Sequence, residues 1–204
     1  MKKPGTSRKN ISVLFWLWLA LSFMAPKDLF AQPADKGPNQ NDPCAMNSLP
    51  AGLQKKLASD FASWRVQKPS DLSPSANARW AAADFKDCPG IAAGNFRQKD
   101  KKSFAILLVP QEKPNTAYRL IIYSPGSETF QEEFAIVDKG DAAGASNLFL
   151  HESRISELFD ETSRLKFHIT APDAVVVFDA GENEYEVQAY YWSDGVYRSS
   201  FVDM

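Results

Sequence analysis

The second half of the chain consists of short apolar runs separated by turn-forming residues, and this pattern limits the fold more than any other feature. The run at 104–109 (FAILLV) is continuous, which is typical of a strand covered on both faces. The runs at 118–123 and 130–137 follow turns that contain proline. Connections this short favour antiparallel neighbours. Further strands are expected at 165–169, 174–178, 185–192 and 196–202.

The first part of the chain has a helical period instead. Apolar residues recur there at steps of four, four and three, which predicts one helix from about residue 48 to 66. These residues are Leu53, Leu57, Phe61 and Trp64. A second helix is expected at 75–86, and residues 138–164 show no clear period. Helices followed by strands predict an α+β fold, in which two N-terminal helices pack on one face of a mostly antiparallel twisted sheet.

The N-terminus has the layout of an export signal. Basic residues precede an uncharged, mostly apolar run at 11–25, which is shorter than the roughly 20 residues that a membrane span needs. We expect a signal peptide at 1–31, cleaved after Ala31 or after Ala25, and an uncleaved anchor is the alternative. A disordered leader rich in proline, glycine and asparagine is expected at 32–47, and a single domain at 48–204.

The sequence contains two cysteines, Cys44 and Cys88. In the oxidising compartment that an export signal implies, they are expected to form one disulfide, with two free thiols as the alternative. The bridge would close a loop of roughly 44 residues and stabilise the fold by about 3 to 4 kcal/mol in the chain-entropy treatment. It would connect the start of the first helix to the end of the second.

Loss of the signal peptide makes the chain more acidic. Removing its five basic and one acidic residues from the 23 basic and 25 acidic residues of the whole chain leaves 18 and 24, a net charge of −6. An acidic surface repels phosphate groups. Nucleic acid is therefore not expected as a partner, and neither is a membrane once the signal is cleaved.

The sequence lacks the motifs of common enzyme classes. It has no His-Glu-x-x-His, no Gly-x-Ser-x-Gly, no phosphate loop and no dinucleotide fingerprint. His151 is expected in an acidic loop and His168 on a strand, a spacing that is not typical of metal ligands. Carboxylates could supply a general acid and base, but scattered acids usually serve solubility. The acids considered are Glu128, Glu132, Glu133, Asp160, Glu161, Glu182 and Glu184. We expect no enzymatic activity and no cofactor.

Residues 88–105 (CPGIAAGNFRQKDKKSFA) resemble the calcium-loop segment of FG-GAP/VCBS-like repeats, where a Gly-Asp-Phe-Asn-Gly-Asp-Gly pattern leads into a strand. The positions that match this frame are Gly94, Phe96, Phe104 and Ala105. The positions where the family places oxygen ligands hold Asn95, Arg97, Lys99 and Ser103. A hard cation needs six or more oxygens. The resemblance therefore implies a turn that has lost its metal, and we expect no calcium binding.

The C-terminal region predicts a hairpin around Asp194-Gly195, because this dipeptide supplies the positive φ of a type I′ turn. That turn sets Trp192 opposite Tyr197 and gathers aromatic side chains on one face. This face is either core against the helices or a partly exposed stacking platform for a glycan or a partner loop. The residues that share the face are Tyr190, Trp192, Tyr197 and Phe201, and the first three are the candidate binding residues.

The arrangement as a whole resembles small secreted bacterial proteins of unassigned function. We expect an exported, periplasmic or secreted, non-enzymatic domain that binds a protein or a glycan at the cell envelope. One alternative is an inhibitor of an envelope-directed hydrolase such as lysozyme, because a net charge of −6 would steer it to a cationic target. Another is a carboxylate-dependent hydrolase.

Overall fold

The computed structural model describes residues 42–83, 85, 87–126, 133–181 and 185–203. All of them belong to one compact unit, residues 41–204. The expected signal peptide and residues 32–41 of the expected leader lie outside the described residues. Of the described residues, 39% are in strands and 25% in helices.

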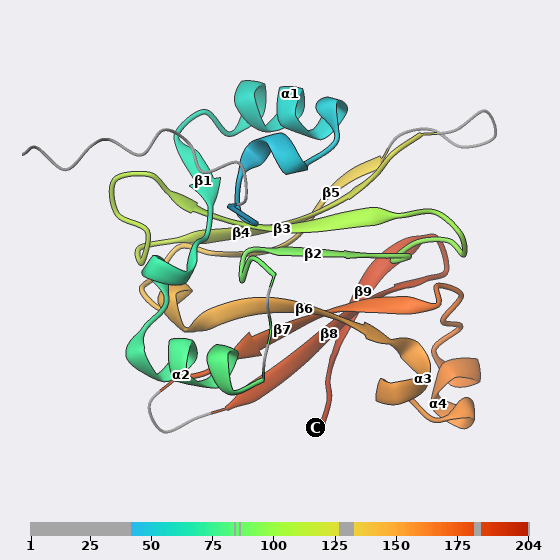
Figure 1. The fold of residues 1–204 in the computed structure, drawn as a ribbon. Helices are drawn as coiled ribbons and strands as arrows, with labels where there is room; N and C mark the ends of the chain where they lie inside the picture. The colour runs from blue at the N-terminus through green and yellow to red at the C-terminus, as the bar shows by residue number, and fades with distance from the viewer. Residues whose placement is uncertain (1–41, 84, 86, 127–132, 182–184, 204) are drawn as a thin grey trace, which may run out of the picture. The chain divides into compact units, whose positions relative to one another are not determined.

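The strands form two antiparallel sheets (Figure 1). Sheet 1 contains β1 (Trp64–Val66), β2 (Ile91–Gly94), β3 (Ser103–Pro110), β4 (Tyr118–Ser124) and β5 (Glu133–Gly140). Its order is β1-β3-β4-β5, and β2 pairs with the part of β3 that β1 leaves open. Sheet 2 contains β6 (Leu148–Arg154), β7 (Asp173–Asp179), β8 (Glu186–Ser193) and β9 (Val196–Phe201), in the order β6-β7-β8-β9.

The two sheets pack face to face, and helices cover both outer surfaces (Figure 1). Helix α1 (Ala51–Asp60) covers the outer face of sheet 1 through Leu53 and Leu57. Helix α2 (Pro74–Ala82) covers the outer face of sheet 2. Another part of that face is covered by α3 (Ile155–Leu158) and by Phe159 and Phe167, which flank α4 (Glu161–Lys166). Short 3₁₀ turns lie at Met46–Ser48, Pro69–Asp71 and Ala145–Asn147.

The expected α+β arrangement is wrong, because the strands divide into two sheets and the two N-terminal helices lie on opposite outer faces. The physical reason is visible in β7, which is apolar on both faces. Val175 and Val177 point to sheet 1, whereas Val176 and Phe178 point to the α2 side. Such a strand needs a cover on each face, and its sequence looks the same whether that cover is a helix or a second sheet.

The first helix is shorter than predicted. It ends at Asp60, and the chain continues through a turn into β1, which pairs with β3. Phe61 and Trp64 nevertheless pack against the same core as the apolar residues of α1. The apolar period therefore continues past the end of the helix. Helix α2 begins one residue earlier than expected, with Pro74 at its first position and the Ser73 hydroxyl accepting a hydrogen bond from the Ala76 N–H.

The expected strand at 165–169 is also wrong. Residues 161–166 form α4, His168 has a φ of 49°, and Ile169 makes an isolated bridge to Ser193. The missing strand of sheet 2 is β6, from the stretch where the sequence showed no clear period. The remaining predicted strands are present, although β5 extends to Gly140 and residues 130–132 lie outside the described residues.

Candidate functional site

The C-terminal hairpin forms with the predicted register. Asp194 and Gly195 have φ values of 50° and 82°, as a type I′ turn requires, and Trp192 pairs with Tyr197. Tyr190 is 3% exposed, and both Tyr190 and Tyr197 pack into the core between the sheets. The aromatic face of the hairpin thus faces sheet 1 and not the helices.

Trp192 and Tyr197 are half-buried and keep part of their surface in solvent. Their rings meet edge to face with centroids 4.8 Å apart, and the Arg97 guanidinium lies 4.9 Å from the Trp192 centroid. Arg97 also makes a 2.7 Å ion pair with Glu133. These contacts join the β2–β3 turn, β5 and the hairpin. A binding role for Tyr190, Trp192 and Tyr197 stays a prediction, and of the three Tyr190 has almost no surface to offer a ligand.

The carboxylate of Asp138, which lies between the two sheets, accepts hydrogen bonds from two tyrosine hydroxyls. Tyr118 from β4 and Tyr190 from β8 both donate to Asp138 Oδ2, at 3.0 and 2.6 Å. A β-bulge after Leu120 inserts Val137 into β5, so that Asp138 lies opposite Leu120 on the inner face. Burial and then the Asp138 charge raise the pKa of Tyr118 to about 12, and burial followed by the hydrogen bond to Asp138 raises that of Tyr190 further.

The turn that resembles a calcium loop uses its polar positions for contacts within the protein. The Asn95 N–H and side-chain amide donate to Asp173 Oδ2 at 2.8 and 3.0 Å. Arg97 pairs with Glu133 as above, and the buried Ser103 hydroxyl lies 2.8 Å from that of Ser124. Phe96 is fully buried between the sheets.

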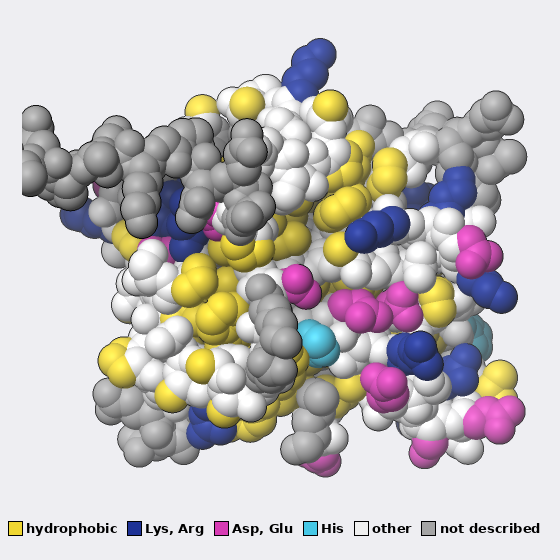
Figure 2. All heavy atoms as spheres, viewed as in Figure 1, with side chains coloured by type: hydrophobic (Ala, Val, Ile, Leu, Met, Phe, Trp, Pro, Cys, Tyr) yellow, Lys and Arg dark blue, Asp and Glu magenta, His cyan; other side chains and the backbone are white. Residues whose placement is uncertain are grey.

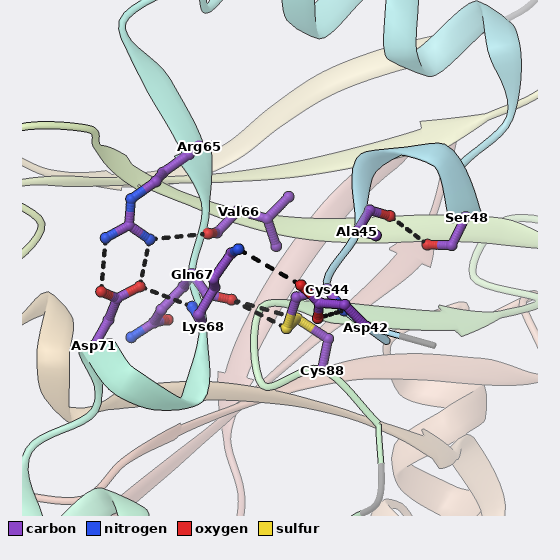
Figure 3. Close-up of a disulfide and its surroundings, with 10 residues drawn as sticks. All are labelled: Asp42, Cys44, Ala45, Ser48, Arg65, Val66, Gln67, Lys68, Asp71 and Cys88. Carbon is purple, nitrogen blue, oxygen red and sulfur yellow. Dashed lines mark hydrogen bonds and ion pairs between the residues drawn. A yellow bond between two sulfur atoms is a disulfide. The ribbon is translucent and has the colours of Figure 1, made fainter. Parts of the chain in front are cut away.

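The disulfide between Cys44 and Cys88 is confirmed (Figure 3). Both cysteines are 2% exposed, and their sulfurs lie 3.8 and 3.3 Å from the Gln67 carbonyl oxygen. The buried Gln67 amide donates to the Ala145 carbonyl at 2.8 Å, and beside it Arg65 and Asp71 form a two-bonded ion pair. The bridge fixes the chain before α1 to the segment after α2, as expected.

Next to the disulfide, the edge strands β2 and β6 of the two sheets meet and leave a groove of about 550 Å³. The Leu150 N–H donates to the Pro89 carbonyl at 2.8 Å and holds the two edges together. A Cβ atom at position 94 would lie only 2.7 Å from Glu152 Cγ. Gly94 has no side chain and therefore permits the close approach of β2 to β6. Figure 2 shows acidic side chains and a histidine gathered over these strands.

The ionisable side chains in the groove come from three segments: β6, the residues just before Cys88, and the end of the β2–β3 turn. The His151 ring stacks on Phe85 with centroids 4.2 Å apart, and burial lowers its pKa against the opposing charges of Asp87 and Glu157. Burial raises the pKa of Glu152, and Asp173 and Glu157 act in the same direction.

Among the described residues, neither Glu152 nor Asp87 has an ion-pair partner. Lys102 also lines the groove, with its ammonium 5.7 Å from the centroid of the Phe104 ring. The groove can therefore hold a polar or cationic group against the two carboxylates, beside the apolar surface of β2 and Leu150.

Sequence reasoning named His151 but missed the groove. Glu152 belongs to β6, which showed no strand period, and Asp87 and Phe85 follow a helix that ends earlier than predicted. No local signal in the sequence brings these residues together. The other histidine, His168, is exposed in the segment after α4, and its Nδ1 lies 3.1 Å from Asp194 Oδ1.

In the described part of the chain, no group of three or more His, Cys, Asp or Glu side chains is placed to hold a metal ion. Within the same residues, no helix is long and apolar enough to cross a membrane. Compared with protein-family models, with curated proteins and with solved structures, the chain gives no significant match.

Proposed function

We propose that this protein is an exported, non-enzymatic binding domain, and that the groove between β2 and β6 receives a segment of another protein at the cell envelope. The observation that carries the proposal is the groove itself, a hollow of about 550 Å³ in which the described residues leave the Glu152 and Asp87 carboxylates without ion-pair partners. Glu152 is half-buried, and a half-buried carboxylate gains from a partner that donates hydrogen bonds or positive charge.

The groove favours a protein segment over a glycan. A sugar ring usually stacks on an open aromatic face, but the Phe85 face is already occupied by His151 at a centroid distance of 4.2 Å. Trp80 also lines the groove, but part of its ring packs against the core beneath α2. A peptide needs no free aromatic face, because its apolar side chains can lie on Ile91, Ala93 and Leu150 while its polar groups meet the carboxylates.

Export is supported by two features. The first 31 residues have the layout of a signal peptide, and the disulfide is typical of proteins that fold in an oxidising compartment. The intact mass of the protein from its native cells tests this, with cleavage near Ala31 as the expected result. A full-length mass would contradict export with removal of a signal peptide.

Photo-cross-linking in the native cells tests the binding site. A benzophenone amino acid replaces Ala93 in the groove, Trp192 in the hairpin, or Lys113 in the exposed β3–β4 turn as the control. The proposal predicts a defined protein adduct from position 93 and none from 113. An adduct from position 192 alone would move the site to the hairpin, and glycan adducts at 93 would exclude a protein partner.

A matched pair of variants then tests the role of the carboxylate. Glu152→Gln should reduce the yield of the adduct from position 93, because it removes the charge without changing the size of the side chain. Glu161→Gln, on the exposed face of α4, should leave the yield unchanged. If the adduct contains a cationic hydrolase, the activity of that enzyme is measured with and without the protein. A loss of hydrolase activity in the presence of the protein would identify it as an inhibitor of that enzyme, a role that its acidic composition suggests.

A further inference from the structure

The outer edge of β9 is a second surface with the properties of an interface. β9 lies at the end of sheet 2 and, within the described residues, pairs with β8 alone (Figure 1). Val196 is 50% exposed and Phe201 is 68% exposed, at opposite ends of the strand. Its sequence, VYRSSF, contains no proline or lysine, and β9 pairs with β8 without a bulge, so of the usual devices that protect an edge strand this short strand carries only the charge of Arg198.

The direction of the backbone groups in β9 follows from the turn that precedes it. In a two-residue hairpin the residues flanking the turn, Ser193 and Val196, form a hydrogen-bonded pair. Alternation then points the N–H and C=O groups of the even-numbered residues toward β8. The 3.0 Å bond from the Val202 N–H to the Val187 carbonyl follows this phase. The backbone groups of Tyr197, Ser199 and Phe201 therefore point to the open edge.

We propose that β9 pairs antiparallel with β9 of a second copy of this chain, with Ser199 opposite the same residue of the second copy. In this register Tyr197 lies opposite the second copy's Phe201, and the reverse pair forms on the other side of the two-fold axis. Each of the three residues whose backbone groups point outward then lies opposite a residue whose backbone groups also point outward, so that the hydrogen bonds between the two copies can form. The two four-stranded sheets become one continuous sheet of eight strands.

Side chains and the direction of the backbone groups disfavour two of the alternative registers. A shift that centres the pair on Arg198 sets two arginines opposite each other, which is unfavourable. If one strand slips by a single residue along the other, outward backbone groups lie opposite inward ones, and the hydrogen bonds between the two copies cannot form. The Ser199 register instead brings the exposed Phe201 onto a tyrosine on the inner face, and the exposed Val196 onto Val202 on the outer face. Like charges do not meet at any position between 196 and 202.

The size of the contact determines how tight the pairing is. One pair of six-residue strands buries less than the roughly 1,000 Å² of a stable interface. The acidic charge of each copy adds a long-range repulsion that salt screens. The dimer is therefore weak, forms at high protein concentration and tightens as the ionic strength rises.

Two neighbouring serines provide a matched test on the purified protein. In the proposed register the two Ser199 Cα atoms are about 5.5 Å apart, within the range of a disulfide. The two Ser200 Cα atoms are about 8 Å apart, because each lies opposite residue 198 of the other copy. Under mild oxidation Ser199→Cys should therefore form a covalent dimer, and Ser200→Cys should not. Cys44 and Cys88 are already paired and do not interfere.

Sedimentation equilibrium of the unmodified protein completes the test. A monomer–dimer equilibrium that shifts to the dimer with concentration and salt is expected. A monomer at all concentrations up to the millimolar range would overturn the proposal. Equal cross-linking of the two cysteine variants, or cross-linking of Ser200→Cys alone, would overturn the register.

Discussion

The substitution Tyr190→Phe removes one hydroxyl from the core between the sheets and keeps the ring. The Tyr190 side chain is almost fully buried, and its hydroxyl lies 2.6 Å from Asp138 Oδ2 and 3.0 Å from Gln188 Oε1. It has one proton to donate, and the shorter contact to the charged carboxylate receives it. Because no ring atoms are lost, the substitution creates no cavity large enough to add to the cost.

The magnitude follows from the kind of bond that is lost. A hydrogen bond to a charged group contributes about 1.5 to 3 kcal/mol, and we expect Tyr190→Phe to lower the free energy of unfolding by about 2 kcal/mol. Tyr118→Phe should cost about 1 kcal/mol, because water replaces part of the bond of this half-buried tyrosine. Tyr191→Phe is the matched control. Tyr191 is equally buried, no hydrogen bond is found for its hydroxyl among the described residues, and its loss should change little.

Urea unfolding of the single and double variants measures these values. In an Asp138→Ala background, Tyr190→Phe should cost less than about 0.5 kcal/mol, because its charged acceptor is already gone. The coupling between the two sites is then about 1.5 kcal/mol. If the two substitutions add within about 0.5 kcal/mol, the bond does not stabilise the fold and the reasoning fails.

The same cluster predicts a pH dependence. The pKa of Tyr118 is raised to about 12 in the folded state by burial and by Asp138, whereas an unfolded tyrosine titrates near 10. A raised pKa means that the folded state holds its proton longer. The contribution of Tyr118 to stability is therefore complete below pH 10 and is lost as the pH rises toward 12. The stability of Tyr118→Phe should fall less steeply across this range than that of the unmodified protein, and equal slopes would contradict the assignment.

Two further predictions concern the disulfide and the hairpin. Replacing Cys44 and Cys88 together by alanine opens a loop with a sequence separation of 44. In denaturant titrations this should lower the free energy of unfolding by about 4 kcal/mol. A loss below about 1 kcal/mol would mean that the native contacts alone hold this segment. Trp192→Ala should cost about 2 to 3 kcal/mol in the same assay, because the half-buried ring supports Tyr197 and Arg97. An unchanged free energy of unfolding would instead identify Trp192 as a free platform.

Several features of this protein could be read from local sequence. The Asp194-Gly195 turn fixed the pairing of Trp192 with Tyr197, because a two-residue loop leaves one register and one alternation of faces. The continuous apolar run at 104–109 marked a strand that is covered on both faces, and both cysteines were placed in one bridge. Each of these features depends on neighbouring residues or on a count, and so needs no knowledge of the fold.

Other features were decided only by the tertiary structure. Whether the second cover of a strand is a helix or another sheet depends on which distant segments meet, since Val175 and Val176 have the same apolar surface in either case. β6 is buried on both faces at Leu148, Phe149 and Leu150 and only half-buried at the next two residues, so its sequence shows no simple period. The groove exists because two sheet edges approach each other at Gly94 and Glu152, residues 58 positions apart, and no local pattern encodes the contact between them.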